Sequence, residues 1–159
     1  MLKPSEDKIF TFDHLKTFFK HTDYHGYLHP YNYFEWTSYV REAFFSEMCT
    51  DFKQILESPI KMMTAKIDSF ILGESSFGDE FYARFSVGKI KRVSCDIIVR
   101  FFNKRLKKIV CETQHTLVFM DSTTQKFAPI PESIREAISR FGEPETPEKN
   151  LTSYQTDEL

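Results

Sequence analysis

The sequence has few cysteines, no excess of either charge and no long apolar run. Cys49, Cys95 and Cys111 are an odd number without a Cys-x-x-Cys pair, so we expect buried thiols instead of disulfides or a metal site. A formal net charge of −2 gives no general attraction to nucleic acid or to anionic membranes, and neither is an expected partner. No segment has the length and apolarity of a membrane span or a signal peptide, and a cytoplasmic location is therefore predicted.

The sequence is rich in phenylalanine, with 17 Phe among 159 residues. Such rings either fill a thick core or line a slot for an apolar ligand. The length fits one domain, which we place at residues 10–141. Residues 1–9 are expected to form an N-terminal extension, and the polar, proline-containing residues 142–159 a disordered tail.

Apolar residues at helical spacing predict one long, largely buried helix. A short apolar segment from Phe10 is expected to form a strand that runs into a polar loop. Pro30 marks a helix start, and the helix is expected to continue to about Met48. The apolar positions Tyr33, Trp36, Val40, Phe44 and Met48 form its stripe, with Trp36, Tyr39 and Phe44 expected in the core. Because little of its surface is polar, a curved sheet wrapped around it is the simplest arrangement.

After Pro59 the apolar period changes from 3.6 to 2. A short helix at 51–57 precedes four strand-like runs near residues 60–72, 81–87, 93–101 and 109–119. The connections are short, so we expect these runs to form an antiparallel meander. A closing helix is predicted within 129–141.

Three motifs resemble those of one enzyme family. The segment 22–33 reads T-D-Y-H-G-Y-L-H-P-Y-N-Y and is similar to the T-D-x-x-G-x-V-x-x-x-N-Y signature of the 4-hydroxybenzoyl-CoA thioesterase family. The segment 77–81 resembles that family's Gly-Asp step into a strand, and 121–131 resembles its ending before the closing helix. The resemblance implies the hotdog fold, an α+β architecture in which a curved antiparallel sheet of about five strands wraps a long central helix.

The resemblance also implies a thioester hydrolase that acts on acyl-CoA or on an acyl-carrier thioester and needs no cofactor. In the family, the aspartate that matches Asp23 is the nucleophile or general base, and the N-terminus of the central helix stabilises the oxyanion. This chemistry is plausible because a thiolate leaving group, with a pKa of about 8.5, needs no strong general acid. Proteins of this kind form homodimers by joining two sheets edge to edge, often paired into tetramers, with active sites between subunits.

One departure from the family concerns the oxyanion site. Pro30 occupies the position whose backbone N–H polarises the thioester carbonyl in the family, and proline has no N–H. Either a shifted helix register lets Tyr31 or Asn32 donate, or the side chain of His29 replaces the missing group. Gly26 is expected to supply the positive-φ turn that positions Asp23.

Other interpretations of these residues remain open. Taken by itself, a loop aspartate such as Asp23 usually caps a turn or the helix. His21, His25 and His29 have the four-residue spacing of metal ligands, but Gly26 and Pro30 interrupt the helix that this would need, and no metal is predicted. Glu35 and Glu42 are either catalytic helix carboxylates or a solvated stripe.

Two further alternatives concern the whole chain. Pro30 and the many phenylalanines also fit a non-catalytic protein that binds acyl thioesters or lipids. A dehydratase is less compatible, because its differently spaced histidine and acidic motifs are missing from the sequence. The basic residues near 89–92 and 104–108 form either a solvated rim or contacts to CoA phosphates.

Overall fold

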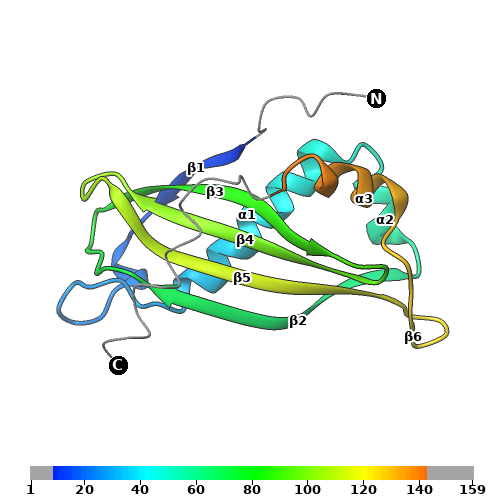
Figure 1. Ribbon diagram of the computed structural model, residues 1–159. Coiled ribbons are helices and arrows are strands. Elements are labelled where there is room, and N and C mark those ends of the chain that lie inside the picture. Colours follow the sequence, from blue (N-terminus) through cyan, green and yellow to red (C-terminus); the bar gives the residue numbers. More distant parts are fainter. Residues whose placement is uncertain (1–8, 143–159) are drawn as a thin grey trace, which may run out of the picture.

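The computed structural model describes residues 9–142, and this part folds into one six-stranded antiparallel sheet with helices on one face (Figure 1). The strands are β1 (Phe10–Lys16), β2 (Ile60–Ile71), β3 (Glu80–Ile90), β4 (Ser94–Asn103), β5 (Lys108–Asp121) and the short β6 (Lys126–Phe127). The helices are η1 (Phe19–His21), α1 (Asn32–Met48), α2 (Phe52–Glu57) and α3 (Glu132–Ser139). The predicted extension and tail lie outside the described residues, apart from Ile9 and Gly142. No helix in the described range is both long and apolar enough to cross a membrane.

The alternation seen in the sequence becomes a one-sided core. Along β5, every second residue from Cys111 to Phe119 is buried, and the residues between them are half-buried. This face packs against α1, where the buried positions Trp36, Val40 and Phe44 recur at helical spacing. Burial of such side chains contributes about 1.5–3 kcal/mol each. The predicted arrangement of a sheet around a long helix is therefore confirmed.

The buried phenylalanines pack against other aromatic rings in the core. Phe44 stacks on Phe85 with ring centroids 4.0 Å apart, and Trp36 packs on Phe81 and Phe101. The prediction that Tyr39 is buried is wrong, since 46% of it is exposed. Its hydroxyl donates to Glu35 at 2.6 Å on the outer surface of α1, because position 39 falls at the border of the apolar stripe.

The strand order differs from the predicted meander. It is β1-β3-β4-β5-β2, so only β3, β4 and β5 form a meander. β2 pairs with the far side of β5, for example Met62 with Phe119, and not with β3. The physical reason is that β1 already occupies the neighbouring edge of β3, with Phe10 opposite Phe85. α1 therefore crosses the sheet between its two edge strands.

Short helices lie at one end of the molecule and loops at the other. α2 and α3 lie at one end, beside the last turns of α1 (Figure 1). The loops 22–31 and 72–79 and the β4–β5 turn lie at the other end, near the first turn of α1. Three free cysteines, Cys49, Cys95 and Cys111, are buried, as expected. The loop end carries the residues predicted to act on a substrate.

Candidate functional site

Asp23 begins a tight turn that is closed by its own backbone and side chain. Its carbonyl oxygen accepts from the N–H of Gly26 at 3.0 Å, and its N–H donates to the carbonyl of Tyr27 at 2.9 Å. Gly26 has φ +82°, the left-handed conformation predicted for it. The carboxylate oxygen Oδ1 accepts from the N–H groups of His25 (2.9 Å) and Tyr27 (3.1 Å). Asp23 therefore caps its own loop, as the simpler interpretation expected.

The same contacts keep the carboxylate of Asp23 ionised. The Tyr27 N–H, which is the largest favourable influence, and the His25 N–H lower the pKa of Asp23, and the nearby His25 and His29 act in the same direction. Oδ2 accepts no hydrogen bond from the described residues, and Asp23 is half-buried. One carboxylate oxygen is thus fixed by the turn while the other is open to a substrate or a water molecule.

The first turn of α1 leaves one backbone donor unused. The N–H groups of Asn32, Tyr33 and Phe34 donate to the carbonyls of His29, Pro30 and Tyr31 at 3.1 Å each. The N–H of Tyr31 has no acceptor within residues 9–142, and it is the first N–H after Pro30. An unpaired N–H at a helix start carries partial positive charge and suits a developing oxyanion.

Asn32 has a structural role in this arrangement. It is buried, and its side-chain Nδ2 donates to the carbonyls of His21 (2.9 Å) and His29 (2.8 Å). Both amide hydrogens are therefore consumed by the protein and hold the ends of the loop together. His29 is exposed, and its ring stacks on Tyr31 with centroids 5.4 Å apart. The predicted site residues thus form two groups. Asp23 and Gly26 belong to one turn, and the rings of His29 and Tyr31 stack on each other. No hydrogen bond between described residues joins the two groups.

A second loop, 72–79, supports the loop of Asp23. The N–H of Leu28 donates to the carbonyl of Ser75 at 2.8 Å, and the N–H of Phe77 donates to the carbonyl of Gly26 at 2.8 Å. Tyr27 also forms a bridge with Ser76. The turn at Gly26 therefore depends on the position of residues 75–77.

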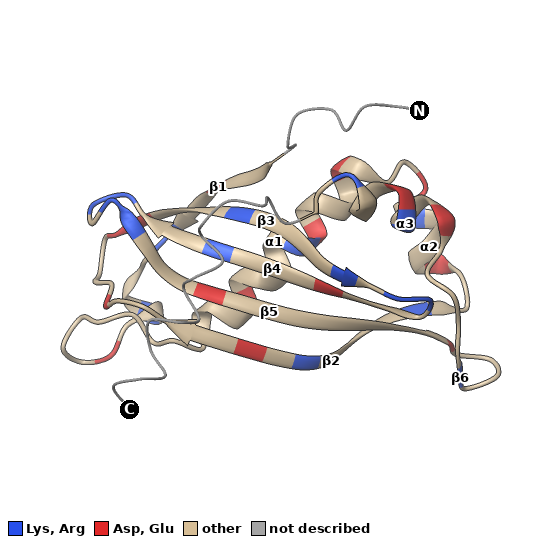
Figure 2. Ribbon diagram, viewed as in Figure 1, with Lys and Arg blue, Asp and Glu red and all other residues tan. Residues whose placement is uncertain are grey.

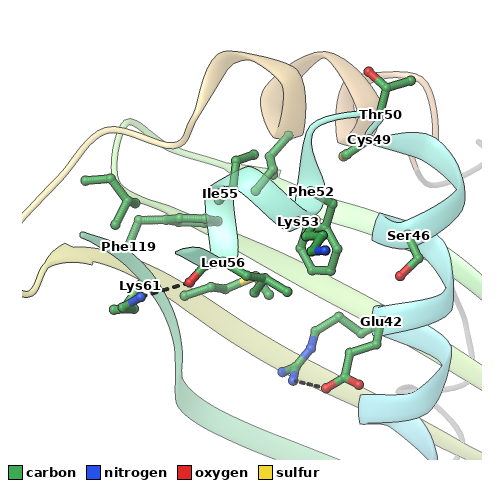
Figure 3. A pocket seen from close by; sticks show the side chains of 14 residues that line it. Glu42, Ser46, Cys49, Thr50, Phe52, Lys53, Ile55, Leu56, Lys61 and Phe119 are labelled. Carbon is green, nitrogen blue, oxygen red and sulfur yellow. Dashed lines mark hydrogen bonds and ion pairs between the residues drawn. The ribbon is translucent and has the colours of Figure 1, made fainter. Parts of the chain in front are cut away.

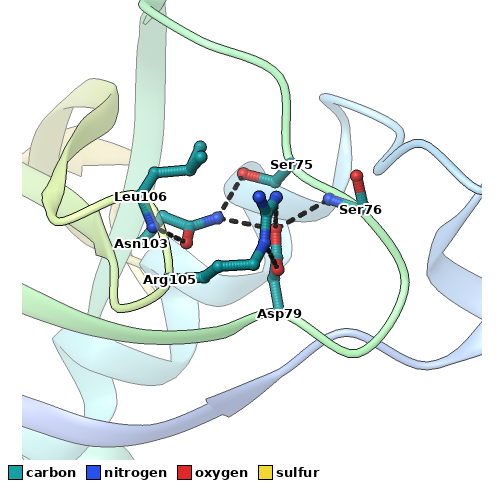
Figure 4. Close-up of polar contacts among 6 residues, drawn as sticks. All are labelled: Ser75, Ser76, Asp79, Asn103, Arg105 and Leu106. Atoms are coloured by element: carbon teal, nitrogen blue, oxygen red, sulfur yellow. Dashed lines mark hydrogen bonds and ion pairs between the residues drawn. The ribbon is translucent and has the colours of Figure 1, made fainter.

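The support loop is held by the buried carboxylate of Asp79, which Figure 4 places at the centre of a polar cluster. Arg105 donates to both of its oxygens (2.6 and 3.0 Å), and Asn103 Nδ2 (2.8 Å) and the N–H of Ser76 (2.9 Å) add two further bonds. Burial opposes the charged form, but these donors outweigh it and lower the pKa of Asp79. The sequence indicated Asp79 through its Gly-Asp motif, whereas Asn103 and Arg105 carry no local signal for this role.

The basic turn between β4 and β5 is only partly available for a ligand. Lys104, Arg105, Lys107 and Lys108 gather at this turn (Figure 2). Arg105 is paired with Asp79, and Lys104 with Asp13 at 2.5 Å. Lys107 and Lys108 have no ion pair with a described residue.

The remaining ionisable candidates, His21, Glu35 and Glu42, contact other residues of the protein. His21 is buried, and its Nδ1 accepts from the N–H of Phe18 at 3.0 Å, while burial and Lys20 lower its pKa. Glu35 accepts from Tyr39, and Glu42 lies 3.6 Å from Arg41. Both glutamates are exposed, which favours the solvated stripe over catalytic carboxylates.

Two of the cavities that border α1 include side chains discussed above. One of about 380 Å³ lies beside η1 and includes His21, Glu35 and Trp36. The other, of about 630 Å³, lies between α1, α2 and the start of β2, at the end far from Asp23. Asp23 lines neither of them.

Solved structures with this fold are numerous. A Staphylococcus aureus protein in complex with CoA is 16% identical, with a TM-score of 0.79 over 88% of this chain and 89% of that one. The dynemicin thioesterase, also 16% identical, has a TM-score of 0.79 over 86% and 99%. A 1,4-dihydroxy-2-naphthoyl-CoA thioesterase from Synechocystis is 14% identical, with a TM-score of 0.76 over 86% and 100%. At these identities the likeness establishes the hotdog fold.

The assignment of the chain to a family rests on sequence comparison. No curated protein matches the chain as a sequence relative. The model of the thioesterase-like superfamily matches residues 19–138, which include the loop of Asp23, the support loop and α1. This family is broader than the 4-hydroxybenzoyl-CoA thioesterases that the motifs resemble. The protein belongs to the thioesterase-like superfamily.

Proposed function

We propose that this thioester hydrolase acts on acyl-CoA, with Asp23 as nucleophile or general base and the Tyr31 N–H at the oxyanion site. The observation that carries the proposal is the ionised carboxylate of Asp23, which has one oxygen fixed by two backbone donors and the other open. A carboxylate held in this way loses little freedom when it attacks a carbonyl or orients a water molecule. The unused N–H of Tyr31 supplies the donor that Pro30 lacks.

Acyl-CoA is preferred to an acyl-carrier thioester as the substrate. Two of the similar structures are described in terms of CoA, one as a CoA complex and one as a naphthoyl-CoA thioesterase. Lys107 and Lys108, at the same end of the chain as Asp23, are suitable cations for CoA phosphates. An acyl-carrier substrate remains the alternative, and comparing the two thioesters of one acyl group separates them.

We further propose a homodimer formed through the edge of β2, which a second pairing can extend to a tetramer. One edge of β2 pairs with no other strand of residues 9–142, and the side chains of β2 include Met63 (49% exposed), Ile67 (43%) and Phe70 (39%). A long, apolar edge strand of this kind is usually covered by another strand. In such a dimer the surface turn of Asp23 would receive a wall from the partner.

The proposed location is the cytoplasm. The three buried free thiols are compatible with a reducing compartment. Cell fractionation tests this proposal, and a secreted protein would contradict it.

The test of the catalytic proposal compares two aspartates whose carboxylates each accept two backbone N–H groups of a turn. Asp121 also closes a turn, since its Oδ1 accepts from the N–H groups of Thr123 (2.8 Å) and Thr124 (3.2 Å). Thiol release from a panel of short, long and aromatic acyl-CoAs should fall roughly 10²–10⁴-fold in Asp23→Asn. Asp121→Asn should retain the rate. Equal rates for Asp23→Asn and the unmodified protein would refute the assigned mechanism.

A second candidate is a non-catalytic protein that binds acyl thioesters. It is favoured by the engagement of Asp23 Oδ1 in its own turn and by the proline at position 30. Calorimetric binding of acyl-CoA without any release of thiol, over the whole panel, would select this function.

A further inference from the structure

The cavity at the far end of α1 is amphipathic. Its volume is about 630 Å³, which lies within the range of about 300–1,000 Å³ typical of small-molecule sites. It is enclosed by the second half of α1, by α2, by the start of β2 and by single residues of β5 and α3 (Figure 3). Its apolar wall consists of Phe52, Ile55, Leu56, Ile60, Met62 and Phe119.

α2 forms one wall of this space and is attached to the rest of the protein at both of its ends. Phe52 anchors α2 by stacking on Phe45 with centroids 5.6 Å apart. The ammonium group of Lys61 donates to the carbonyls of Leu56 (2.9 Å) and Ser58 (2.7 Å) and so ties the other end of α2 to β2. Although its carbonyl is bound by Lys61, the side chain of Leu56 remains 54% exposed. Apolar surface that faces an open cavity gains free energy when an apolar ligand covers it.

One charged group of the cavity is nearly buried. The side chain of Arg41 is only 14% exposed, and burial lowers its pKa. Its Nη1 donates to Thr64 Oγ1 at 3.1 Å, and its buried Nε has no acceptor among the described residues. A guanidinium group has five N–H donors, and within residues 9–142 only one of them has a hydrogen-bond acceptor.

The charge of Arg41 is weakly compensated. Its ion-pair partner, Glu42, lies 3.6 Å from Nη2 and partly offsets the effect of burial on the pKa of Arg41, but the Glu42 side chain is 61% exposed. His115, which lies close enough to interact electrostatically with Arg41, is held neutral at pH 7 because its pKa is lowered to about 4. Arg41, Lys53 and Lys61 face the cavity with Glu42 as the only acid. A buried cation in these surroundings is stabilised by an anionic ligand.

We propose that this cavity binds an apolar carboxylic acid, with its chain on the wall of α2 and its carboxylate on Arg41. The carboxylate takes the position beside Nη2 that Glu42 approaches from outside, and Glu42 turns into solvent. The site is separate from the Asp23 turn of the same chain, since ten residues of α1 between Tyr31 and Arg41 span about 15 Å. The ligand is of the same chemical class as the acid that thioester hydrolysis releases, so the protein would bind a product of its own reaction.

The experiment is calorimetric titration of the full chain with three ten-carbon ligands that differ only in the head group. Decanoate should bind about tenfold or more tightly than decan-1-ol, because it adds charge-assisted hydrogen bonds. Decylammonium should bind most weakly. Equal affinities for decanoate and decan-1-ol would overturn the proposal.

Four variants test the contacts one by one. Arg41→Met should reduce the affinity for decanoate to that for decan-1-ol, and it should fold because an apolar side chain replaces a weakly paired buried charge. Lys53→Met, at an exposed cation on the same cavity, should change the affinity by less than about twofold. Glu42→Gln should strengthen decanoate binding and leave decan-1-ol binding unchanged. Leu56→Trp should block all three ligands.

Two outcomes would contradict the assignment of Arg41 and of the cavity. One is an equal loss of affinity for decanoate in Lys53→Met and Arg41→Met. The other is an unchanged affinity for all three ligands in Leu56→Trp. Because binding is measured without turnover, the result does not depend on the catalytic proposal. Asp23→Asn should keep its affinity for decanoate even where it has lost all hydrolysis.

Discussion

At the scale of single residues, Asp23 combines a structural and a chemical property. Two backbone N–H groups occupy Oδ1, which fixes the turn and keeps the group ionised. Its second oxygen has no partner in the described part of the chain. The capping interpretation and the catalytic interpretation of this residue are therefore compatible, because each uses a different oxygen.

Either the backbone N–H of Tyr31 or the side chain of His29 can replace the N–H that Pro30 lacks. The variant His29→Ala distinguishes these two groups. The His29 ring is exposed and stacks on Tyr31, whereas the Tyr31 N–H belongs to the backbone. If the backbone N–H stabilises the oxyanion, His29→Ala should lower kcat much less than the roughly 10²–10³-fold expected for loss of such a donor. His25→Ala, at another exposed loop histidine, is the matched control. A loss of that full size in His29→Ala alone would assign the role to the ring.

His115 should make the fold sensitive to mild acid. Burial, and to a lesser extent Arg41, lowers its pKa to about 4, and neither ring nitrogen has a partner among the described residues. The unfolded chain, with a histidine pKa of about 6.5, binds the proton more readily, so the free energy of unfolding falls as pH drops from about 6.5 to 4. The loss attributable to His115 is about 3 kcal/mol.

Urea denaturation at pH 7 and pH 4.5 measures this dependence. His115→Gln should lose less stability between the two pH values than the unmodified protein. An identical pH dependence in both proteins would show that another group is responsible.

At the scale of elements, α1 and two loops determine the geometry of the site. The apolar spacing from Tyr33 to Phe44 predicted α1, and Pro30 placed its start within two residues. The contact between the loops 22–31 and 72–79 was not predictable, because backbone hydrogen bonds between distant segments leave no pattern in either segment. The same holds for Arg105 and Asp79, which are 26 residues apart.

The ion pair of Asp79 should control both stability and rate. Asp79→Asn removes the charge that Arg105 and Asn103 bind, and we expect a loss of about 1.5–3 kcal/mol in the free energy of unfolding at pH 7. The pKa of Asp79 is lowered below the unfolded value of about 3.9, so its contribution is complete above that value and is lost as the pH falls through the lower pKa of the folded state. The difference between variant and unmodified protein should therefore disappear only below the folded pKa.

Activity separates the positioning role of Asp79 from a purely structural role. The turn of Asp23 rests on residues 75–77, so kcat of Asp79→Asn should fall at temperatures where the variant is fully folded. Asp121→Asn, at a similar turn far from this support loop, should keep its kcat. An unchanged kcat in folded Asp79→Asn would limit this residue to stability.

At the scale of the whole molecule, the unpaired edge of β2 should mediate self-association. Ile67→Lys places a charge on this exposed strand, where two copies would bring like charges together. The variant should have the mass of one chain, 18.8 kDa, by light scattering, whereas the unmodified protein should have at least twice that mass. Phe127→Lys, at a 63% exposed residue of β6, is the control and should remain associated. A monomeric unmodified protein would contradict the proposal.

By itself the sequence determined most of the helices and strands of this protein and the turn of one loop. Periodicity depends on neighbouring residues alone, so α1 and the strands β1 to β5 were predicted correctly, whereas β6 was not predicted. The left-handed turn at Gly26 was predicted from the residue type. The tertiary structure alone decided which strands are neighbours, and it placed β2 beside β5 instead of β3. It also decided which donors remain unpaired and left Arg41 nearly buried beside an open cavity. These properties depend on how distant segments pack, and a one-dimensional pattern does not record that packing.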